Sequence, residues 1–149
     1  MPKLDLDAIP RTNATGYPPQ YAGEVAGRWY RRLSPALGLT DFGASHVVLK
    51  PGAWSAQRHW HENEDELVVM IAGEAVLHDD NGRTILRAGD VAAFPKNDGN
   101  GHCLVNDGGS DCEFVVIGQA VNGPCHYPDI DLAHAKGRFT RKDGSSFTE

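Results

Sequence analysis

Short strand-like segments recur along this chain at intervals of roughly eight to twelve residues, with turn-forming residues between them. The segments are rich in β-branched and other apolar side chains, and the intervening stretches contain glycine, proline, asparagine and aspartate. This pattern is typical of an all-β sandwich or barrel. The expected strands cover residues 46–50, 55–61, 66–72, 75–78, 84–87, 91–94, 102–106 and 112–117.

The strand pattern divides the chain into three regions. Residues 1–34 form an N-terminal arm with a possible edge strand, because the segment from Arg28 to Leu33 fits either a helical turn or a strand. Residues 35–126 hold the barrel, and residues 127–149 form a polar C-terminal tail that we expect to be irregular. The chain has one His-x-His segment and no internal repeat, so we expect a single barrel.

Charge and hydropathy exclude several classes of partner. The formal net charge of −6 disfavours nucleic acid and anionic membranes, because both require a basic surface. No stretch approaches about eighteen apolar residues, so we expect no membrane span. The N-terminus lacks the apolar core of a signal peptide, which predicts a cytoplasmic protein. Cys103, Cys112 and Cys125 lack Cys-x-x-Cys spacing, so we expect three reduced thiols.

Three histidines and one glutamate form the most distinctive chemical pattern in the chain. His59 and His61 are two residues apart, so their side chains point to the same face of a strand. Glu66 opens the next apolar run, and His102 comes from a strand much later in the chain. Imidazole and carboxylate groups in this combination suit a divalent transition metal. The sequence does not choose among iron, manganese, nickel, zinc, copper and cobalt.

Glycine and proline positions around these residues make the pattern more specific. Gly52 and Gly73 bracket the first three residues of the set, and Gly89 and Pro95 precede His102. In order and separation, residues 52–106 resemble the two motifs of the cupin superfamily. Two departures occur: the first glycine interval is one residue longer than usual, and the step from Pro95 to His102 is two residues longer. The chain resembles a small bacterial single-domain cupin.

The resemblance implies a double-stranded β-helix, or jelly roll, with a metal inside the barrel. Carried over residue by residue, the metal ligands are His59, His61, Glu66 and His102. Glu66 is also a candidate catalytic base, as in cupins whose glutamate leaves the metal, and Asp65 is an alternative carboxylate if the turn is tighter. Residue parity adds three candidates for groups that orient a ligand or contact substrate, namely Gln57, Met70 and Asn106.

Several neighbouring charged residues have a simpler interpretation. We expect Glu62, Glu64 and Asp65 to form a solvated acidic turn, and His78 and His126 to be single surface histidines. We expect Arg28, Arg31 and Arg32 to form a solvated basic edge, with anion binding as the alternative.

Three imidazoles and one carboxylate leave open positions on a six-coordinate ion, so the pattern favours catalysis or ligand binding over a structural metal. The resemblance implies a metal-dependent enzyme that acts on a polar, oxygen-rich small molecule, either isomerase-like or dioxygenase-like. The alternative is a small-molecule-binding sensor without turnover. The apolar outward face of residues 67–71 and the N-terminal arm both need a partner surface, so we expect a homodimer with two-fold symmetry.

Overall fold

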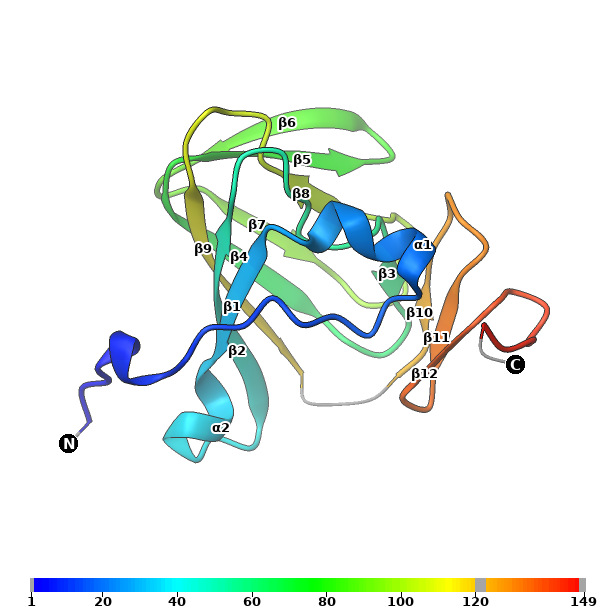
Figure 1. The fold of residues 1–149 in the computed structure, drawn as a ribbon, viewed down its shortest axis with the longest axis horizontal. Coiled ribbons are helices and arrows are strands. Elements are labelled where there is room, and N and C mark those ends of the chain that lie inside the picture. The colour runs from blue at the N-terminus through cyan, green and yellow to red at the C-terminus, as the bar shows by residue number, and fades with distance from the viewer. Residues whose placement is uncertain (1, 120–122, 148–149) are drawn as a thin grey trace.

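The computed structural model describes residues 2–119 and 123–147, which form three antiparallel sheets (Figure 1). A five-stranded sheet has the spatial order β1 (Arg28–Arg32), β2 (Phe42–Leu49), β9 (Cys112–Gln119), β4 (Glu66–Ala72) and β7 (Val91–Phe94). A three-stranded sheet has the order β6 (Gly82–Arg87), β5 (Glu74–Asp79) and β8 (Cys103–Val105). A four-stranded sheet has the order β12 (Arg138–Thr140), β11 (Ala133–Ala135), β10 (Cys125–His126) and β3 (Trp60–His61).

Helical structure is confined to short segments. The helix α1 (Pro19–Ala22) precedes β1, and α2 (Leu33–Leu37) follows it. Single turns of 3-10 helix occupy Leu6–Ala8 and Gly23–Val25. No helix in the described ranges combines the length and apolar character needed to cross a bilayer. The predicted all-β class is confirmed, because strands predominate and every strand pair in the three sheets is antiparallel.

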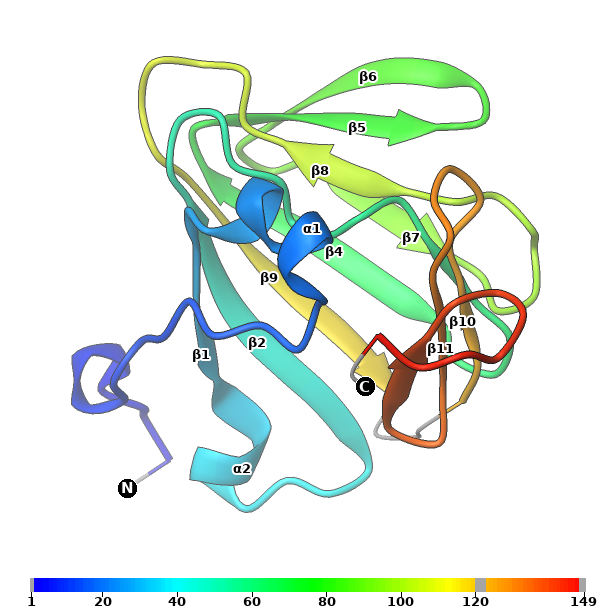
Figure 2. The same cartoon turned by 45° about the vertical axis from the view of Figure 1, so that its right-hand side comes forward.

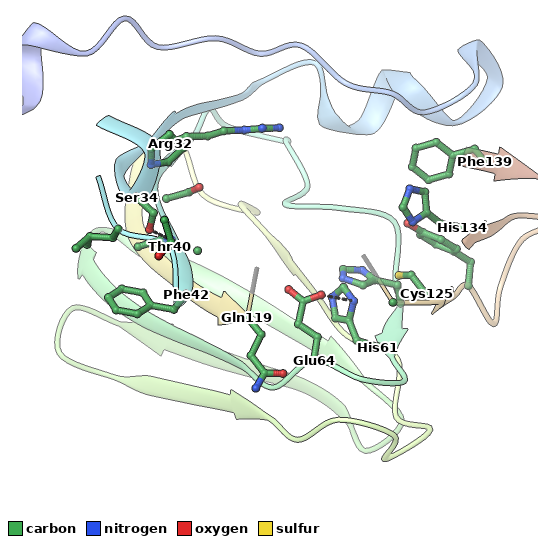
Figure 3. A pocket seen from close by; sticks show the side chains of 18 residues that line it. Arg32, Ser34, Thr40, Phe42, His61, Glu64, Gln119, Cys125, His134 and Phe139 are labelled. Atoms are coloured by element: carbon green, nitrogen blue, oxygen red, sulfur yellow. Dashed lines mark hydrogen bonds and ion pairs between the residues drawn. The ribbon is translucent and has the colours of Figure 1, made fainter. Parts of the chain in front are cut away.

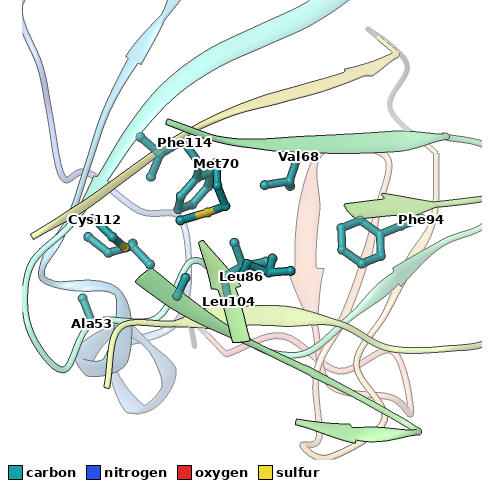
Figure 4. Close-up of a cluster of buried hydrophobic side chains, with 11 residues drawn as sticks. Ala53, Val68, Met70, Leu86, Phe94, Leu104, Cys112 and Phe114 are labelled. Atoms are coloured by element: carbon teal, nitrogen blue, oxygen red, sulfur yellow. The ribbon is translucent and has the colours of Figure 1, made fainter. Parts of the chain in front are cut away.

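The main apolar core lies between the five-stranded and three-stranded sheets (Figures 2 and 4). Strand β4 shows how alternation builds it, because Val68 and Met70 are each 2% exposed while Ile71 on the opposite face is 47% exposed. Burial of these side chains supplies the main stabilising free energy of such a barrel. The core residues are Val47, Leu49, Ala53, Val68, Met70, Ala75, Leu86, Phe94, Leu104, Cys112 and Phe114.

A second apolar cluster joins the two ends of the chain. Tyr17 of the N-terminal arm packs edge-on against Tyr127, with ring centroids 6.0 Å apart, and lies 5.2 Å from Phe139. The arm also pairs with β1, because Thr12 and Tyr30 exchange backbone hydrogen bonds. The N-terminal arm is therefore ordered by docking on the barrel and on the C-terminal hairpin.

The C-terminal region differs from the expectation of an irregular tail. Residues 133–140 form the hairpin β11–β12, which extends the sheet begun by β3 and β10. These strands are three residues long, too short for sequence alternation to show them above a polar background. The ambiguous segment after Gly27 is likewise resolved, because Arg28–Arg32 forms the edge strand β1.

The expected strand over residues 55–61 is shorter in the structure. Only Trp60–His61 forms a strand, and the preceding residues cross between sheets. Isolated bridges hold this crossing segment, one between Trp54 and Val105 and one between His59 and His102. The crossing places His59 beside the end of β8, which is where the candidate site begins.

Candidate metal centre

His59 and His102 lie side by side because their backbones pair directly. The amide of His59 donates to the carbonyl of His102 at 3.1 Å, and the amide of His102 donates to the carbonyl of His59 at 2.9 Å. The His59 ring is oriented by its own chain, since Nδ1–H donates to the carbonyl of Gln57 at 2.8 Å. A proton held on Nδ1 leaves Nε2 with a free lone pair, the form that binds metals.

The Glu66 carboxylate lies between two imidazoles. Its Oε1 is 3.1 Å from Nε2 of His102, and its Oε2 is 3.3 Å from Nε2 of His61. Ligand atoms of His59, Glu66 and His102 all lie within 4.8 Å of one another. The structure therefore brings together all four residues that the sequence pattern nominates, with His61 attached through His59 and Glu66.

Burial and neighbouring charges shift the proton affinities of this cluster. Burial, reinforced by the charge of His102, lowers the pKa of His59 to about 4. Burial also opposes charge on His61, but the nearby Cys125 and Glu66 side chains outweigh it and raise the pKa of His61 to about 10. Burial alone would raise the pKa of Glu66, yet its hydrogen bond with His102 and its close contact with His61 hold that pKa well below its usual range.

Two buried ring nitrogens of the cluster, Nε2 of His61 and Nδ1 of His102, lack a hydrogen-bond partner among the described residues. His61 Nε2 is shielded from solvent and, although close to Glu66, is not aligned for a hydrogen bond with any described residue. A buried polar atom without a partner costs free energy, and a bound cation would remove that cost. The donor set of imidazole nitrogens and one carboxylate fits a first-row divalent ion. The residues present can thus hold such a metal.

The cluster opens into a pocket bounded by the four-stranded sheet, β2 and α2 (Figure 3). The cavity has a volume of about 690 Å³, large enough for a small polar metabolite. Across the four-stranded sheet, register places His61 opposite Cys125, Cys125 opposite His134, and His134 opposite Phe139. All four line the cavity, as does Glu64.

An adjoining cavity of about 360 Å³ connects the same cluster to β1. Its lining includes Arg28, Tyr30 and Arg32, which alternate along the strand and so share its inner face. Arg28 donates from Nη1 to the carbonyl of Ser55 at 2.8 Å, while its buried Nε has no hydrogen-bond partner among the described residues. Arg31, on the outer face, instead donates to the carbonyl of Ile9. Arg28 and Arg32 therefore line the cavity that holds the candidate metal centre, where Arg28 is partly buried and Arg32 is exposed to solvent.

Three residues nominated by strand parity do not line either cavity. The Gln57 side chain donates to the carbonyl of Tyr21 and to Glu24, so its backbone carbonyl is the group that reaches His59. Met70 is packed in the main core. Asn106 is fully buried in a turn, which its side chain stabilises through hydrogen bonds with Leu49, Ser110 and Gly108. Strand parity did not apply to Gln57 and Asn106, because both lie outside the strands in the structure.

The acidic segment before β4 is not a uniformly solvated turn. The Glu64 side chain is 19% exposed and its Oε2 lies 3.5 Å from Nδ1 of His61, and burial raises the pKa of Glu64. Asp65 accepts the backbone amide of Lys96 and so caps a loop, which leaves Glu66 as the carboxylate of the cluster. Glu62 pairs with His126 at 2.6 Å, so His126 is not a single surface histidine.

Sequence reasoning missed Glu64, Cys125 and His134 as pocket residues. No local signal marks Cys125 or His134, because they come to the site through long-range pairing of β10 and β11. Glu64 could have been found from its spacing, since it is two residues before Glu66.

Comparison with known proteins agrees with this architecture. The model of the family described as cupin domain matches residues 45–118. A crystal structure named as a cupin-superfamily sugar phosphate isomerase from Silicibacter pomeroyi is 43% identical, covers 99% of this chain and 97% of that one, and superposes with a TM-score of 0.93. A putative sugar phosphate isomerase from Acidithiobacillus ferrooxidans is 28% identical over 76% of this chain and 74% of that one, with a TM-score of 0.69.

A curated protein from Thermotoga maritima, named an oxalate-binding protein, is 36% identical over 73 residues. That match covers 49% of this chain, and the chain spans 58% of that protein's length. On the family match, the near full-length structural similarity and the three-sheet architecture, the chain belongs to the cupin superfamily.

Proposed function

We propose that this protein is a metal-dependent enzyme that isomerises a sugar phosphate or a similar anionic, oxygen-rich small molecule. One observation carries the proposal: a cluster of metal-binding groups and two inward-facing arginines line the same cavity. The 43% identical structure named a sugar phosphate isomerase supports it, because that similarity covers nearly the full length of both chains.

The metal would be held by His59, His61, Glu66 and His102. The donors would be three imidazole nitrogens and one carboxylate. The lowered pKa of His59 keeps that ring neutral at physiological pH, which is the form that binds a metal. A divalent ion bound here supplies Lewis-acid polarisation of a substrate carbonyl or hydroxyl oxygen. Glu66 holds its charge in this environment, which suits a ligand.

The arginines of β1 fit the anionic end of such a substrate. A guanidinium group presents several donors in a plane and binds phosphate or carboxylate through paired hydrogen bonds. Arg32 lines both cavities, and the buried Nε of Arg28 has no hydrogen-bond partner within residues 2–119 and 123–147. A substrate anchored there would extend its oxygen atoms toward the histidine cluster in the same cavity.

Glu64 is the proposed acid–base group that transfers a proton between two carbon atoms of the substrate. Aldose–ketose isomerisation transfers one proton from carbon 2 to carbon 1 and another from oxygen 2 to oxygen 1, so it needs an acid–base group and no external oxidant. Glu64 lines the cavity, contacts His61 and lies outside the set of proposed metal ligands. A half-buried carboxylate with a raised pKa suits general acid–base catalysis. Glu66 is the alternative base.

The test is to purify the protein without chelator, determine its metal, and incubate it with aldose and ketose phosphates and their unphosphorylated sugars in deuterated water. We expect interconversion of a phosphate ester, with deuterium appearing at the carbon that receives the proton. Glu64→Gln should abolish exchange. Glu62→Gln is the matched control, because Glu62 pairs with His126 and does not line the cavities. Turnover that requires oxygen would instead favour a dioxygenase.

Binding without turnover is the second candidate, favoured by the similarity to the oxalate-binding protein. The same arginines and metal would then hold a small dicarboxylate. Titration calorimetry with oxalate distinguishes the two: stoichiometric binding of oxalate, with no reaction of any sugar phosphate in the metal-loaded protein, would replace the isomerase proposal.

A further inference from the structure

A cysteine, Cys125, lies next to the candidate metal centre. Ligand atoms of His59, His61 and Cys125 all lie within 4.8 Å of one another, and this group shares His59 with the group that contains Glu66 and His102. We propose that the Cys125 thiolate is a further ligand of the metal, bound beside His59 and His61. The proposal rests on the metal centre proposed above and adds to it a sulfur donor.

Strand pairing fixes the position of this sulfur. β10 pairs with β3 in a register that sets Cys125 directly opposite His61. Residues opposite each other on antiparallel strands have Cβ atoms about 4.5–5.5 Å apart and project to the same face. Both side chains line the larger cavity, and Figure 3 shows them adjacent. The pairing of β10 with β3 therefore fixes the position of Cys125 beside His61.

The surroundings favour a bound thiolate over a solvated one. Cys125 is 5% exposed and lies two residues from Tyr127, whose ring also lines the cavity, with its centroid 5.7 Å from that of His59. A buried thiolate needs a compensating cation. A metal at His59 and His61 provides one, and in return a thiolate favours softer ions such as zinc or cobalt over manganese.

The other two cysteines provide internal controls. Cys103 and Cys112 are also buried, and neither belongs to a group of converging histidine, cysteine or carboxylate ligands among the described residues. Burial raises the pKa of each thiol to about 11, so both are expected to remain protonated thiols. Any metal–sulfur signal should therefore depend on Cys125 alone.

The experiment replaces the metal with cobalt(II) and records the absorption spectrum. We expect a near-ultraviolet thiolate-to-cobalt charge-transfer band in the wild-type protein, in addition to the visible d–d bands. Cys125→Ser should lose the charge-transfer band and keep the d–d bands. Cys103→Ser and Cys112→Ser should keep both.

X-ray absorption of the wild-type zinc form provides a measurement without any variant. A sulfur scatterer at about 2.3 Å from zinc would support the ligand. Cobalt bound stoichiometrically with no charge-transfer band, or a zinc shell of nitrogen and oxygen alone, would overturn the thiolate ligand and leave the proposed function intact. Failure of the wild-type chain to bind cobalt or zinc at all would overturn both proposals.

Discussion

The backbones of His59 and His102 form an antiparallel bridge, in which each amide donates a hydrogen bond to the carbonyl of the other residue. This bridge joins the two parts of the candidate ligand set, which are far apart in the sequence. The His102 ring is held in turn by Phe94, stacked on it with centroids 3.6 Å apart and ring planes 3° apart. Backbone pairing and ring stacking together make the cluster a preorganised part of the barrel.

Removal of a histidine from the cluster should remove the metal. His59→Ala or His61→Ala deletes a nitrogen donor, and we expect loss of most of the bound ion, measured by elemental analysis of protein purified without chelator. His78→Ala is the control, because His78 lies outside both ligand groups. Full metal occupancy in the His59→Ala/His61→Ala double variant would contradict the assignment.

Arg32→Gln should weaken binding of the anionic substrate. We expect KM to rise about tenfold with a smaller effect on kcat, which corresponds to about 1.4 kcal/mol. This free energy lies near the lower limit for a hydrogen bond to a charged group, because Arg32 is exposed and solvent screens its charge. Arg31→Gln is the matched control, since the neighbouring side chain faces away and binds the carbonyl of Ile9. Equal effects of the two substitutions on KM would show that β1 contributes general charge and no specific site.

The metal-free protein should lose stability at alkaline pH because of His61. Its folded pKa of about 10 lies above the usual value of 6.5, so the folded state binds more protons between these values. The contribution of His61 to stability is therefore fully present below about pH 6.5 and declines as pH rises toward 10. His59 acts in the opposite sense, since its pKa of about 4 makes stability fall as pH drops from 6.5 to 4.

Urea unfolding of the chelator-treated protein across this pH range measures both the alkaline and the acid decline in stability. In His61→Gln the alkaline decline should disappear while the acid decline from His59 remains. Metal binding should in addition release about one proton at pH 8, because the ion must displace the proton on His61. An unchanged alkaline decline in His61→Gln would show that another group causes it.

Asn106→Ala should destabilise the protein without emptying the metal centre. The side chain donates to the carbonyls of Leu49 and Ser110 and accepts from the amide of Gly108. Leaving these buried groups unpaired costs about 2–4 kcal/mol. Denaturant unfolding should show that loss, and elemental analysis should show normal metal content. Metal loss in the folded variant would contradict this prediction and indicate that Asn106 supports the candidate metal centre.

The outer face of the five-stranded sheet should form a homodimer interface. Ile71 and Val91 are 47% and 58% exposed, and Leu67, Ala93 and Ile117 line an apolar depression on the same sheet. Val91→Glu should produce monomers in sedimentation experiments. Ile85→Glu is the control, because Ile85 is 48% exposed on β6 of the other sheet. A wild-type monomer at tens of micromolar, an order-of-magnitude working range, would contradict the prediction.

The sequence alone predicted the all-β class, and the four residues that it nominated as metal ligands lie close together in the structure. Alternation and turn residues are local properties, so the strand over residues 66–72 and that over residues 91–94 were predicted with the bounds the structure shows. The His-x-His spacing likewise carried two imidazoles to one face. Such features need no knowledge of which strands pair.

The tertiary structure decided what surrounds the cluster. Cys125 and His134 reach the cavity because β10 and β11 pair beside β3, and Arg28 and Arg32 reach it because β1 pairs with β2. Asn106 has the expected parity, yet burial in a turn ties up all its hydrogen-bonding groups. Pairing between distant strands depends on the packing of the whole barrel, so no local period in the sequence reports it.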